Sequence, residues 1–451
     1  MDAVISVVEN RLDEPTTKGL ARAVTRAIRD GALEPGQRLP PIRTMAQQLM
    51  LSPTTVSAAW QLLARSGTIR SDGRRGTTIA PTDRVGGDRY LRALHHQSDV
   101  SLDLSTGTPD AAMLPDLGAA LSSIPLSATT ASYLDDPVLP ELRAVLLADW
   151  PYAADDLLVV DGALDALDLV VRTLLRPGDL VLVDTPAFPP LLDLLEYRGV
   201  EVAGIPLDAT GPVLSEVKAS LSRGPAALFL QPRSHNPTGV SMSPTRARAL
   251  TRVIAASDVF VVEDDSAGPI AAGEPISLGQ WVPDQVLHVR SFSKSFGPDL
   301  RIAAVSGPPS LLSPVRHARA LGQGWTSRLL QHLLVALHES PEALSQVSRA
   351  RAEYARRREL VVQRLAERGI EVGGTDGINI WVPVRDEAAA VLRLASQGIA
   401  VTPGSPFSVD RRALTDGHIR VTTGLVDHDH ARIADLIADA ADAGAWTAQH
   451  R

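Results

Sequence analysis

One stretch of the chain, residues 291–301, combines residue types that suit covalent and phosphate-binding chemistry. In it Lys294 lies between Ser293 and Ser295, and Arg301 follows seven residues later. A lysine amine can form a Schiff base with an aldehyde group, and serine hydroxyls and a guanidinium can bind a phosphate. The preceding apolar run 286–289 predicts a buried strand, which places Lys294 on the loop that leaves this strand. A surface lysine near a surface arginine would explain the same residues equally well.

The elements around this stretch alternate between apolar strands and helices. A helix is predicted from Gly162 to Leu175, and Pro177-Gly178 ends it. Short buried strands are predicted at 157–161, 180–184, 226–230, 259–262 and 286–289. This alternation predicts an α/β domain with a mostly parallel sheet that is covered by helices on both faces. Ligands bind such sheets at the carboxyl ends of the strands.

Several residues at those strand ends could hold an aldehyde cofactor with a ring and a phosphate. Gly162 and Ala163 open a helix, whose free N–H groups suit a phosphate. Asp264 follows an apolar strand and could keep a pyridine nitrogen protonated. Asn236 could donate to a phenolic oxygen of the ring, and Phe188 could stack on its face. Taken singly, a strand-to-helix turn, a helix cap, a plain turn and a core phenylalanine explain these residues as well.

Composition restricts the class of protein. The 451 residues, 44% hydrophobic and 21% charged, suit a soluble protein of two or three domains. The absence of cysteine excludes disulfides, thiolate catalysis and cysteine zinc sites, and no metal site is expected. The first 14 residues lack the apolar core of a secretory signal, and no run approaches the roughly 18 apolar residues of a membrane helix. The expected location is the cytoplasm, with no membrane partner.

The first 80 residues differ in charge from the rest of the chain. They contain 11 Lys+Arg against 7 Asp+Glu, a net of +4, while the remainder has 33 against 45, a net of −12. Apolar spacing predicts a helix from Thr16 or Thr17 to about Asp30, a second from Ile42 to Met50, and a third capped by Ser52. Two short strands then flank a turn that carries Arg74 and Arg75. A helix-turn-helix with a basic wing fits this pattern, and a generic three-helix core explains the apolar spacing equally well.

The stretch from Leu20 to Ala80 resembles the winged helix-turn-helix of the GntR family of bacterial repressors. The similarity lies in residues 27–33, in Pro35-Gly36-Gln37-Arg38-Leu39-Pro40, and in later positions such as Thr55-Val56 and Gly76-Thr77. The resemblance implies that the partner is an operator in double-stranded DNA. It also implies a set of residues that contact this DNA: Arg43, Ser52, Thr54, Thr55, Arg74, Arg75, Gly76 and Thr77. Pro53 stands where the family often has a basic residue, so the base contacts of the third helix stay open.

Residues 101–445 resemble the fold type I enzymes that depend on pyridoxal phosphate, the aspartate aminotransferase superfamily. The ordered set of motifs comprises Gly107, Tyr133, Gly162-Ala163, Phe188, Asn236-Pro237-Thr238-Gly239, Asp264, Ser291-x-Ser293-Lys294, Arg301 and Arg420. The resemblance implies that Lys294 forms the Schiff base and that Asp264 pairs with the pyridine nitrogen. It further implies that Ser291, Ser293, Arg301 and the 162–163 backbone hold the phosphate. Tyr133 would reach the phosphate of a partner subunit, and Arg420 would bind an amino-acid carboxylate.

A GntR domain (1–80), a linker (81–100) and an aminotransferase-like domain (101–451) together resemble the MocR subfamily of transcription regulators. The resemblance implies a homodimeric, cytoplasmic regulator that senses pyridoxal phosphate, an amino acid or an amine. An aminotransferase with an accessory DNA-binding domain is the alternative, and a regulator that has lost its cofactor is disfavoured. Transaminases usually have a tyrosine two or three residues after the aspartate, but Asp264 is followed by 265–268 without one. Loss of this donor raises the pKa of the Schiff base and favours binding over fast turnover.

Overall fold

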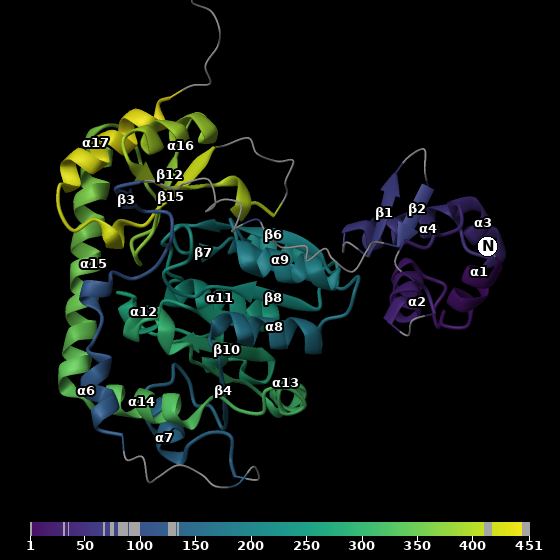
Figure 1. The fold of residues 1–451 in the computed structure, drawn as a ribbon, viewed down its shortest axis with the longest axis horizontal. Helices are drawn as coiled ribbons and strands as arrows, with labels where there is room; N and C mark the ends of the chain where they lie inside the picture. Colours follow the sequence, from purple (N-terminus) through teal and green to yellow (C-terminus); the bar gives the residue numbers. More distant parts are fainter. Residues whose placement is uncertain are drawn as a thin grey trace, which may run out of the picture.

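The computed structural model describes residues 2–29, 32–34, 36–65, 68–72, 76–79, 89, 100–124, 132, 135–409 and 417–443. Figure 1 shows a small N-terminal domain beside a larger α/β domain. The Lys18 Nζ atom of the small domain lies 4.0 Å from the Asp179 Oδ1 atom of the large domain. Most of the predicted linker lies outside the described residues. No helix among the described residues is long and apolar enough to cross a membrane.

The N-terminal domain packs four helices and a two-stranded hairpin around one core. Its elements are α1 Asp2–Glu9, α2 Thr17–Arg29, α3 Ile42–Gln48, α4 Pro53–Arg65, β1 Ile69–Asp72 and β2 Gly76–Ile79. The helix α1 was not predicted, although Val4, Ile5 and Val8 form its buried face. Ser52 caps α4 as predicted, because its Oγ accepts from the Thr55 backbone amide at 2.9 Å, and Pro53 is the first residue of the helix.

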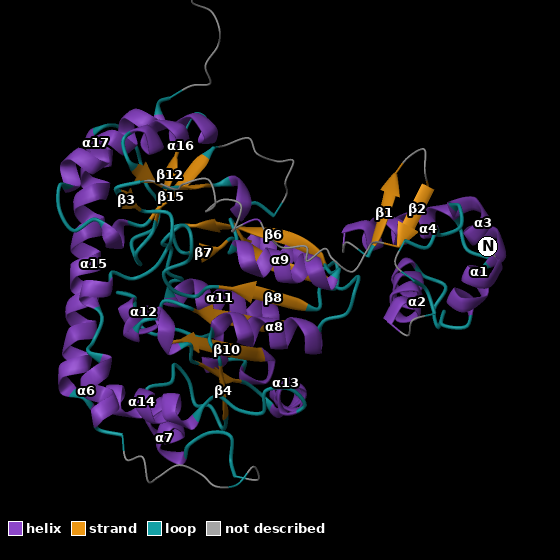
Figure 2. Ribbon diagram, viewed as in Figure 1, coloured by secondary structure: helices purple, strands orange, loops and turns teal. Residues whose placement is uncertain are grey.

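The large domain is built on an eight-stranded sheet (Figure 2). Its strand order is β4-β11-β10-β9-β8-β5-β6-β7, and β10, β9, β8, β5 and β6 pair in parallel. The antiparallel β11 lies between β4 and β10. The bounds are β4 Leu157–Val160, β5 Leu180–Thr185, β6 Glu201–Asp208, β7 Gly211–Pro212, β8 Ala227–Leu230, β9 Phe260–Asp265, β10 Val286–Ser291 and β11 Ala303–Ser306.

Both faces of this sheet are buried, as the apolar runs predict. In β4, Leu158 and Val160 pack toward α8 and α9, whereas Leu157 and Val159 pack toward α7 and α14. The helices of the large domain are α6 Leu117–Ser122, α7 Pro140–Ala148, α8 Ala163–Leu174, α9 Pro189–Arg198, α10 Leu214–Leu221, α11 Pro244–Ile254, α12 Ser293–Phe296, α13 Pro309–Ala320 and α14 Arg328–Glu339. The alternation of side chains along each strand therefore decides which residues face which helical layer.

A smaller C-terminal lobe is joined to the sheet by the long helix α15, Pro341–Glu367. Tyr354 of α15 belongs to the core of the large lobe, and Val361 and Leu365 belong to the core of the small lobe. The remaining elements of this part are β3 Leu102–Asp103, β12 Ile380–Pro383, α16 Glu387–Ser396, β13 Ile399–Ala400, β14 Thr402–Pro403, β15 His418–Val421 and α17 His430–Ala441. Its three-stranded sheet has the order β12-β15-β14, which brings Arg420 toward the large sheet.

Candidate cofactor and DNA-binding sites

Lys294 lies on the short helix α12, directly after β10, and not on a loop as the sequence predicts. The chain forms a single turn of helix after β10. This turn allows Phe292 and Phe296 both to be buried. The Lys294 Nζ atom lies 3.5 Å from Ser266 Oγ. Burial lowers the pKa of Lys294, and the nearby Asp264 carboxylate opposes this shift. A lysine with a lowered pKa has a larger fraction of the neutral amine that attacks an aldehyde.

Asp264 was predicted to follow a strand. In the structure it is the next-to-last residue of β9. Its Oδ2 accepts a 2.7 Å hydrogen bond from Gln231 Nε2. Its Oδ1 is buried and has no hydrogen-bond partner among the described residues. Burial raises the pKa of Asp264, while the Gln231 donor and Lys294 counteract the rise. A buried acceptor with a free lone pair fits a protonated ring nitrogen, since buried polar atoms normally find partners.

The phosphate-binding features meet at the start of α8. Gly162 has φ +102°, and no side chain caps the amides of the first turn, which begins at Ala163. Arg301 donates from Nη2 to the Asp161 carbonyl at 3.3 Å. A Cβ atom on Gly162 would lie 3.0 Å from this Nη2, so the absence of a side chain lets the guanidinium approach the helix start. Free amides beside a guanidinium suit a phosphate group.

These groups surround one cavity of about 370 Å³, within the range of small-molecule sites. The residues that were predicted to bind the cofactor or effector and that line this cavity are Ala163, Phe188, Asn236, Asp264, Ser291, Ser293, Lys294, Arg301 and Arg420. Gly162 borders the cavity through its contact with Arg301. Tyr133 lies outside the described residues. The large sheet and β15 of the C-terminal lobe thus bring together residues that are 257 positions apart in the sequence, from Ala163 to Arg420.

Arg420 reaches the cavity from β15 and is 1% exposed. Its Nη2 donates to the Ser105 carbonyl and, at 3.1 Å, to Thr402 Oγ1, while Nη1 lies 3.4 Å from Asn236 Oδ1. The guanidinium also lies over the Phe407 ring at 5.3 Å. The side chain is therefore held in place by protein groups and presents Nη1 toward Asn236.

Among the residues of the site that were not predicted from the sequence are Gln231, Ser266 and Asp184. Gln231 lines the cavity and joins its parts, because its Oε1 accepts from the Asn236 amide at 2.7 Å. Ser266 stands two residues after Asp264, one of the two positions where the resemblance to transaminases leads us to expect a tyrosine. Asp184 accepts from the Gln231 backbone at 2.9 Å, and burial raises its pKa to about 7. A signal was available for two of them, since Asp184 and Gln231 stand at the carboxyl ends of neighbouring parallel strands.

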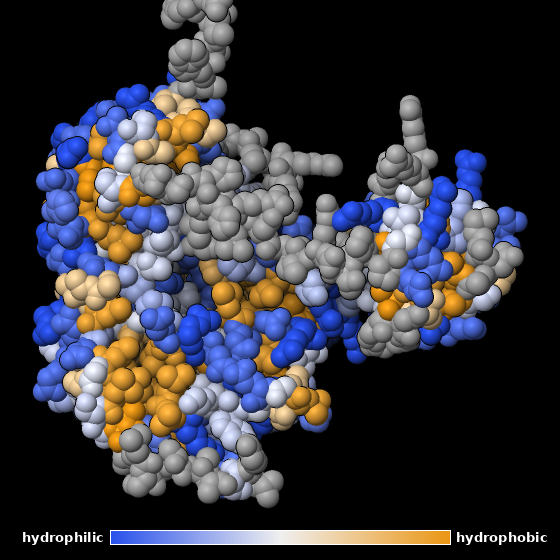
Figure 3. Space-filling view, in the orientation of Figure 1, coloured by the Kyte–Doolittle hydropathy of each residue, from blue (hydrophilic) through white to orange (hydrophobic). Residues whose placement is uncertain are grey.

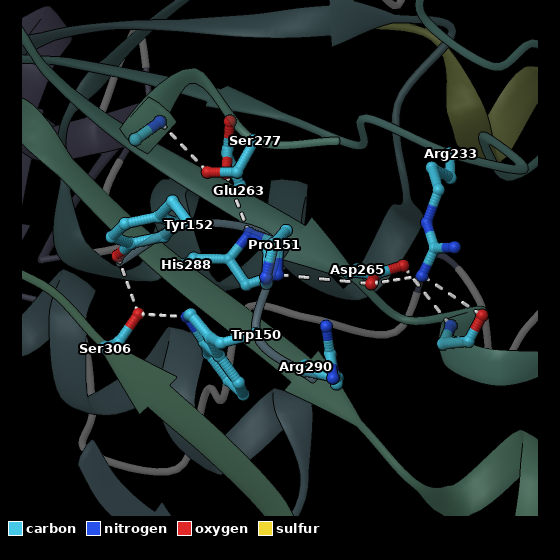
Figure 4. Close-up of polar contacts among 12 residues, drawn as sticks. Trp150, Pro151, Tyr152, Arg233, Glu263, Asp265, Ser277, His288, Arg290 and Ser306 are labelled. Carbon is cyan, nitrogen blue, oxygen red and sulfur yellow. Dashed lines mark hydrogen bonds and ion pairs between the residues drawn. The ribbon is translucent and has the colours of Figure 1, made fainter. Parts of the chain in front are cut away.

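Behind Asp264, a buried polar network supports the strand (Figure 4). Glu263 Oε2 lies 2.7 Å from His288 Nδ1 and accepts from Ser277 Oγ at 2.5 Å. Asp265 accepts from Arg233 Nη2 at 2.6 Å and lies 4.0 Å from His288 Nε2. Burial would raise the pKa of Asp265, but Arg233 and His288 hold it below the usual value. Glu263 and Asp265 therefore face away from the cavity, and Asp264 alone faces into it.

The predicted DNA-binding residues that the structure describes lie near the starts of α3, α4 and β2. Arg43, Ser52 and Thr54 are exposed, and Thr55 is half-buried. The hydroxyl groups of Ser52 and Thr55 lie 2.8 Å apart, so both serve the start of α4. Gly76 has φ +86° and begins β2 together with Thr77. Arg74 and Arg75 lie outside the described residues.

Comparison with known families and proteins matches both domains. Residues 100–437 match the aminotransferase class I and II family, and residues 16–79 match the bacterial regulatory proteins of the gntR family. The vitamin B6 salvage pathway transcriptional repressor PtsJ of Salmonella typhimurium is 33% identical, over 88% of this chain and 92% of its own. The pyridoxine biosynthesis transcriptional regulator PdxR of Corynebacterium glutamicum is 26% identical, over 95% of this chain and 96% of its own.

Solved aminotransferases share the fold of the large domain. The kynurenine aminotransferase of Pyrococcus horikoshii has a TM-score of 0.69 at 24% identity and covers 78% of this chain and 94% of its own. The aspartate aminotransferase of Thermus thermophilus has a TM-score of 0.67 at 22% identity, with 78% and 95% covered. Fold and site thus define a GntR-type DNA-binding domain joined to a fold type I domain that binds pyridoxal phosphate. The chain belongs to the MocR subfamily of GntR transcription regulators.

Proposed function

We propose that this regulator senses pyridoxal phosphate, or an amino acid or amine that reacts with it, through Lys294. One observation carries the proposal: a lysine amine, an unpartnered carboxyl oxygen and an uncapped helix start beside a guanidinium meet in a single cavity. The same chain carries a DNA-binding domain. Occupancy of the cavity can influence DNA binding only if the ligand has different affinities for the two DNA-binding states of the protein.

The residues of the cavity have separate tasks in this proposal. Bound pyridoxal phosphate supplies an aldehyde and an electron-withdrawing ring. Lys294 would bond to the aldehyde, Asp264 would accept a hydrogen bond from the protonated ring nitrogen, and Asn236 would donate to the ring's phenolic oxygen. The phosphate would be held by Ser291, Ser293, Arg301 and the first amides of α8, and Phe188 would cover one face of the ring. Arg420 would receive the carboxylate of an amino-acid effector, for which a bidentate guanidinium is suited.

The names of two relatives favour a form of vitamin B6 as the effector. PtsJ is named for vitamin B6 salvage and PdxR for pyridoxine biosynthesis. Another relative, TauR of Rhodobacter capsulatus, is 27% identical over 86% of this chain and 88% of its own. The enzyme alternative, an aminotransferase with an accessory DNA-binding domain, has the aminotransferase fold in its favour. Ser266 in place of a tyrosine favours sensing, because a donor to the phenolic oxygen is lost.

We further propose that the regulator is a homodimer. Figure 3 shows an apolar patch over the part of the large domain where α6 and α14 lie. The groove there has a volume of about 490 Å³, and its apolar residues include Ile124, Val335 and Ala336. A contiguous apolar patch of this kind is typical of protein interfaces. We propose that a second copy of the chain covers this groove.

The test is reconstitution of the full-length protein with pyridoxal phosphate. The wild-type protein should acquire a visible absorption band, borohydride should fix the cofactor on Lys294, and Lys294→Ala should remove the band. Operator binding should change when the cofactor is added to the wild type but not to Lys294→Ala. A wild type that stays colourless would refute the proposal. Multiple-turnover transamination across a panel of amino acids would instead favour the enzyme, and light scattering would report a monomer or a dimer.

A further inference from the structure

Gln231 occupies a position from which one amide group contacts two parts of the cofactor site. It follows β8 directly, and its side chain lies on the cavity side of the sheet. The Nε2 group donates to Asp264 Oδ2 at 2.7 Å, and a weaker contact of 3.4 Å joins it to Ser266 Oγ. The Oε1 atom accepts from the Asn236 amide at 2.7 Å. Both ends of the side chain are therefore engaged.

The backbone of Gln231 is fixed as well. Its amide donates to Asp184 Oδ2 at 2.9 Å, so the carboxylate of β5 holds the end of β8. Asn236 in turn lies 3.4 Å from Arg420 Nη1, the guanidinium that β15 contributes. Gln231 thus stands between Asp264 on β9 and the turn that faces the C-terminal lobe. Among the described residues, Gln231 alone donates a hydrogen bond to the Asp264 carboxylate.

We propose that Gln231 is a positioning residue that keeps Asp264 ionised and oriented toward the cofactor and locks the Asn236 turn to it. The proposal rests on the proposed function, because it assigns Asp264 to the ring nitrogen. A carboxylate offers about four lone-pair sites, and the Gln231 donor uses one on Oδ2. Oδ1 is thereby left for the cofactor. The amide does not titrate, so its support of the ionised form persists at every working pH.

The charged groups around Asp264 define the background for a pH test. Lys294 from α12 and Arg420 from β15 face it across the cavity, and Asp265 and His288 lie behind the strand. His235, also buried, lines the space on the β8 side, where burial lowers its pKa to about 3 and keeps it neutral. Asp184 lies beyond the Gln231 backbone. Substitutions at Gln231 leave all these groups in place.

Two nearly isosteric substitutions should change cofactor affinity with opposite pH trends. Gln231→Met removes the donor, so the pKa of Asp264 rises and the loss of affinity grows as the pH falls. Gln231→Glu sets a second carboxyl beside Asp264, so the loss grows as the pH rises and both groups tend to ionise. We expect a loss of about tenfold at the unfavourable end of each profile, in line with a hydrogen bond to a charged group.

The experiment is a titration of full-length wild type and variants with pyridoxal phosphate between pH 6 and 9, followed by absorbance. Affinities are expressed as ratios to the wild type, so the titration of the free cofactor cancels. Gln285→Met is the matched control, because Gln285 donates to three backbone carbonyls far from the cavity. Thermal unfolding and operator binding identify any variant that fails to fold.

The outcomes separate the inference from the proposed function. Opposite pH trends in the two Gln231 variants, with a flat ratio for Gln285→Met, support the inference. A loss that is independent of pH in both variants overturns it, since that is the mark of a merely structural residue. Unchanged affinity in a folded Gln231→Met variant also overturns it. A wild type that takes up no pyridoxal phosphate overturns the proposed function and the inference together.

Discussion

The guanidinium of Arg301 packs against the Cα of Gly162, so that a Cβ added there would lie 3.0 Å from Arg301 Nη2. The two residues belong to different elements, since Gly162 precedes α8 and Arg301 precedes β11. Both have positive φ, +102° for the glycine and +45° for the arginine. Close approach of backbone and guanidinium here builds the phosphate side of the cavity.

Gly162→Ala should therefore weaken cofactor binding. The new methyl group forces Arg301 away and places an L-residue in a backbone conformation that such residues rarely adopt. The strain costs about 1–3 kcal/mol of free energy. The measurement is the dissociation constant for pyridoxal phosphate by absorbance. Gly224→Ala is the control, because Gly224 also has positive φ (+65°) but a Cβ there would meet nothing within 4 Å. Equal affinities for Gly162→Ala and wild type would remove this contact from the phosphate site.

Arg420→Lys should keep the visible spectrum and basal operator binding but lose the response to an amino-acid effector. A lysine cannot hold a carboxylate with two parallel hydrogen bonds. Because the arginine is buried and bonded to Ser105 and Thr402, we also expect a loss of stability of about 1–3 kcal/mol. Operator titrations with and without effector provide the measurement.

Thr402→Val is the control for Arg420, since it removes one anchor of the guanidinium and leaves the guanidinium itself. This variant should still respond to effector. If Arg420→Lys responds at wild-type effector concentrations, Arg420 has a structural role, and the effector is pyridoxal phosphate alone or an amine without a carboxylate.

Arg43→Ala should weaken operator binding by about 1–3 kcal/mol, as expected for a base contact or a well-placed phosphate contact. The side chain is exposed near the start of α3. Fluorescence anisotropy at several salt concentrations measures the effect, because lost phosphate contacts also reduce the salt dependence. Arg223→Ala, at an exposed ion pair of the large domain, should bind DNA like the wild type. Normal binding by Arg43→Ala would exclude this residue from the interface.

Asp184 should make the stability of the protein depend on pH. Burial raises its pKa from 3.8 to about 7, so the folded protein binds more protons than the unfolded one between these values. Stability is thus lost as the pH rises from about 4 to 7, by up to about 4 kcal/mol. Asp184→Asn should remove this loss, so the melting temperature of the variant relative to wild type should increase with pH.

Asp208→Asn is the counterpart with the opposite sign. The pKa of Asp208 is lowered to about 2, chiefly by hydrogen bonds from Thr210 and Arg246, and its stabilising effect is lost as the pH falls below about 4. Because this carboxylate is exposed, the change should be small.

A melting temperature of Asp184→Asn that follows the wild type at every pH would show that Asp184 does not hold its proton in the folded state.

The hydrophobic periodicity and the turn residues of the sequence predicted most of the fold but few of the residues that support the site. The apolar runs located β4, β5, β8, β9 and β10 to within a few residues, because each is buried on both faces. The position of Lys294 on a helix was missed, since a single turn of four residues has no detectable period. The helix α1 was missed although Val4, Ile5 and Val8 share the spacing of one helical face.

The role of Gln231 could not be deduced from the sequence because it depends on how strands pair. Its contacts with Asp264 and Asp184 follow from the order β9-β8-β5, which local patterns do not encode. The predicted cofactor residues, by contrast, form an ordered set of motifs, so their order in the chain was sufficient to propose them. Which residues surround a motif is decided by the tertiary arrangement.

The alternation of Glu263, Asp264 and Asp265 along β9 makes this strand intolerant of changes in length. Deleting or inserting one residue before Glu263 would turn each side chain to the opposite face of the sheet. Two carboxylates would then turn toward the cofactor face, while Arg233 would lose the Asp265 carboxylate and His288 would lose the Glu263 carboxylate in the interior. Point substitutions on either face can be made independently. A shift of one residue would disrupt both the cofactor cavity and the buried polar network behind β9. An engineer who wishes to graft another effector specificity onto this scaffold should therefore vary the loops and keep the length of β9 unchanged.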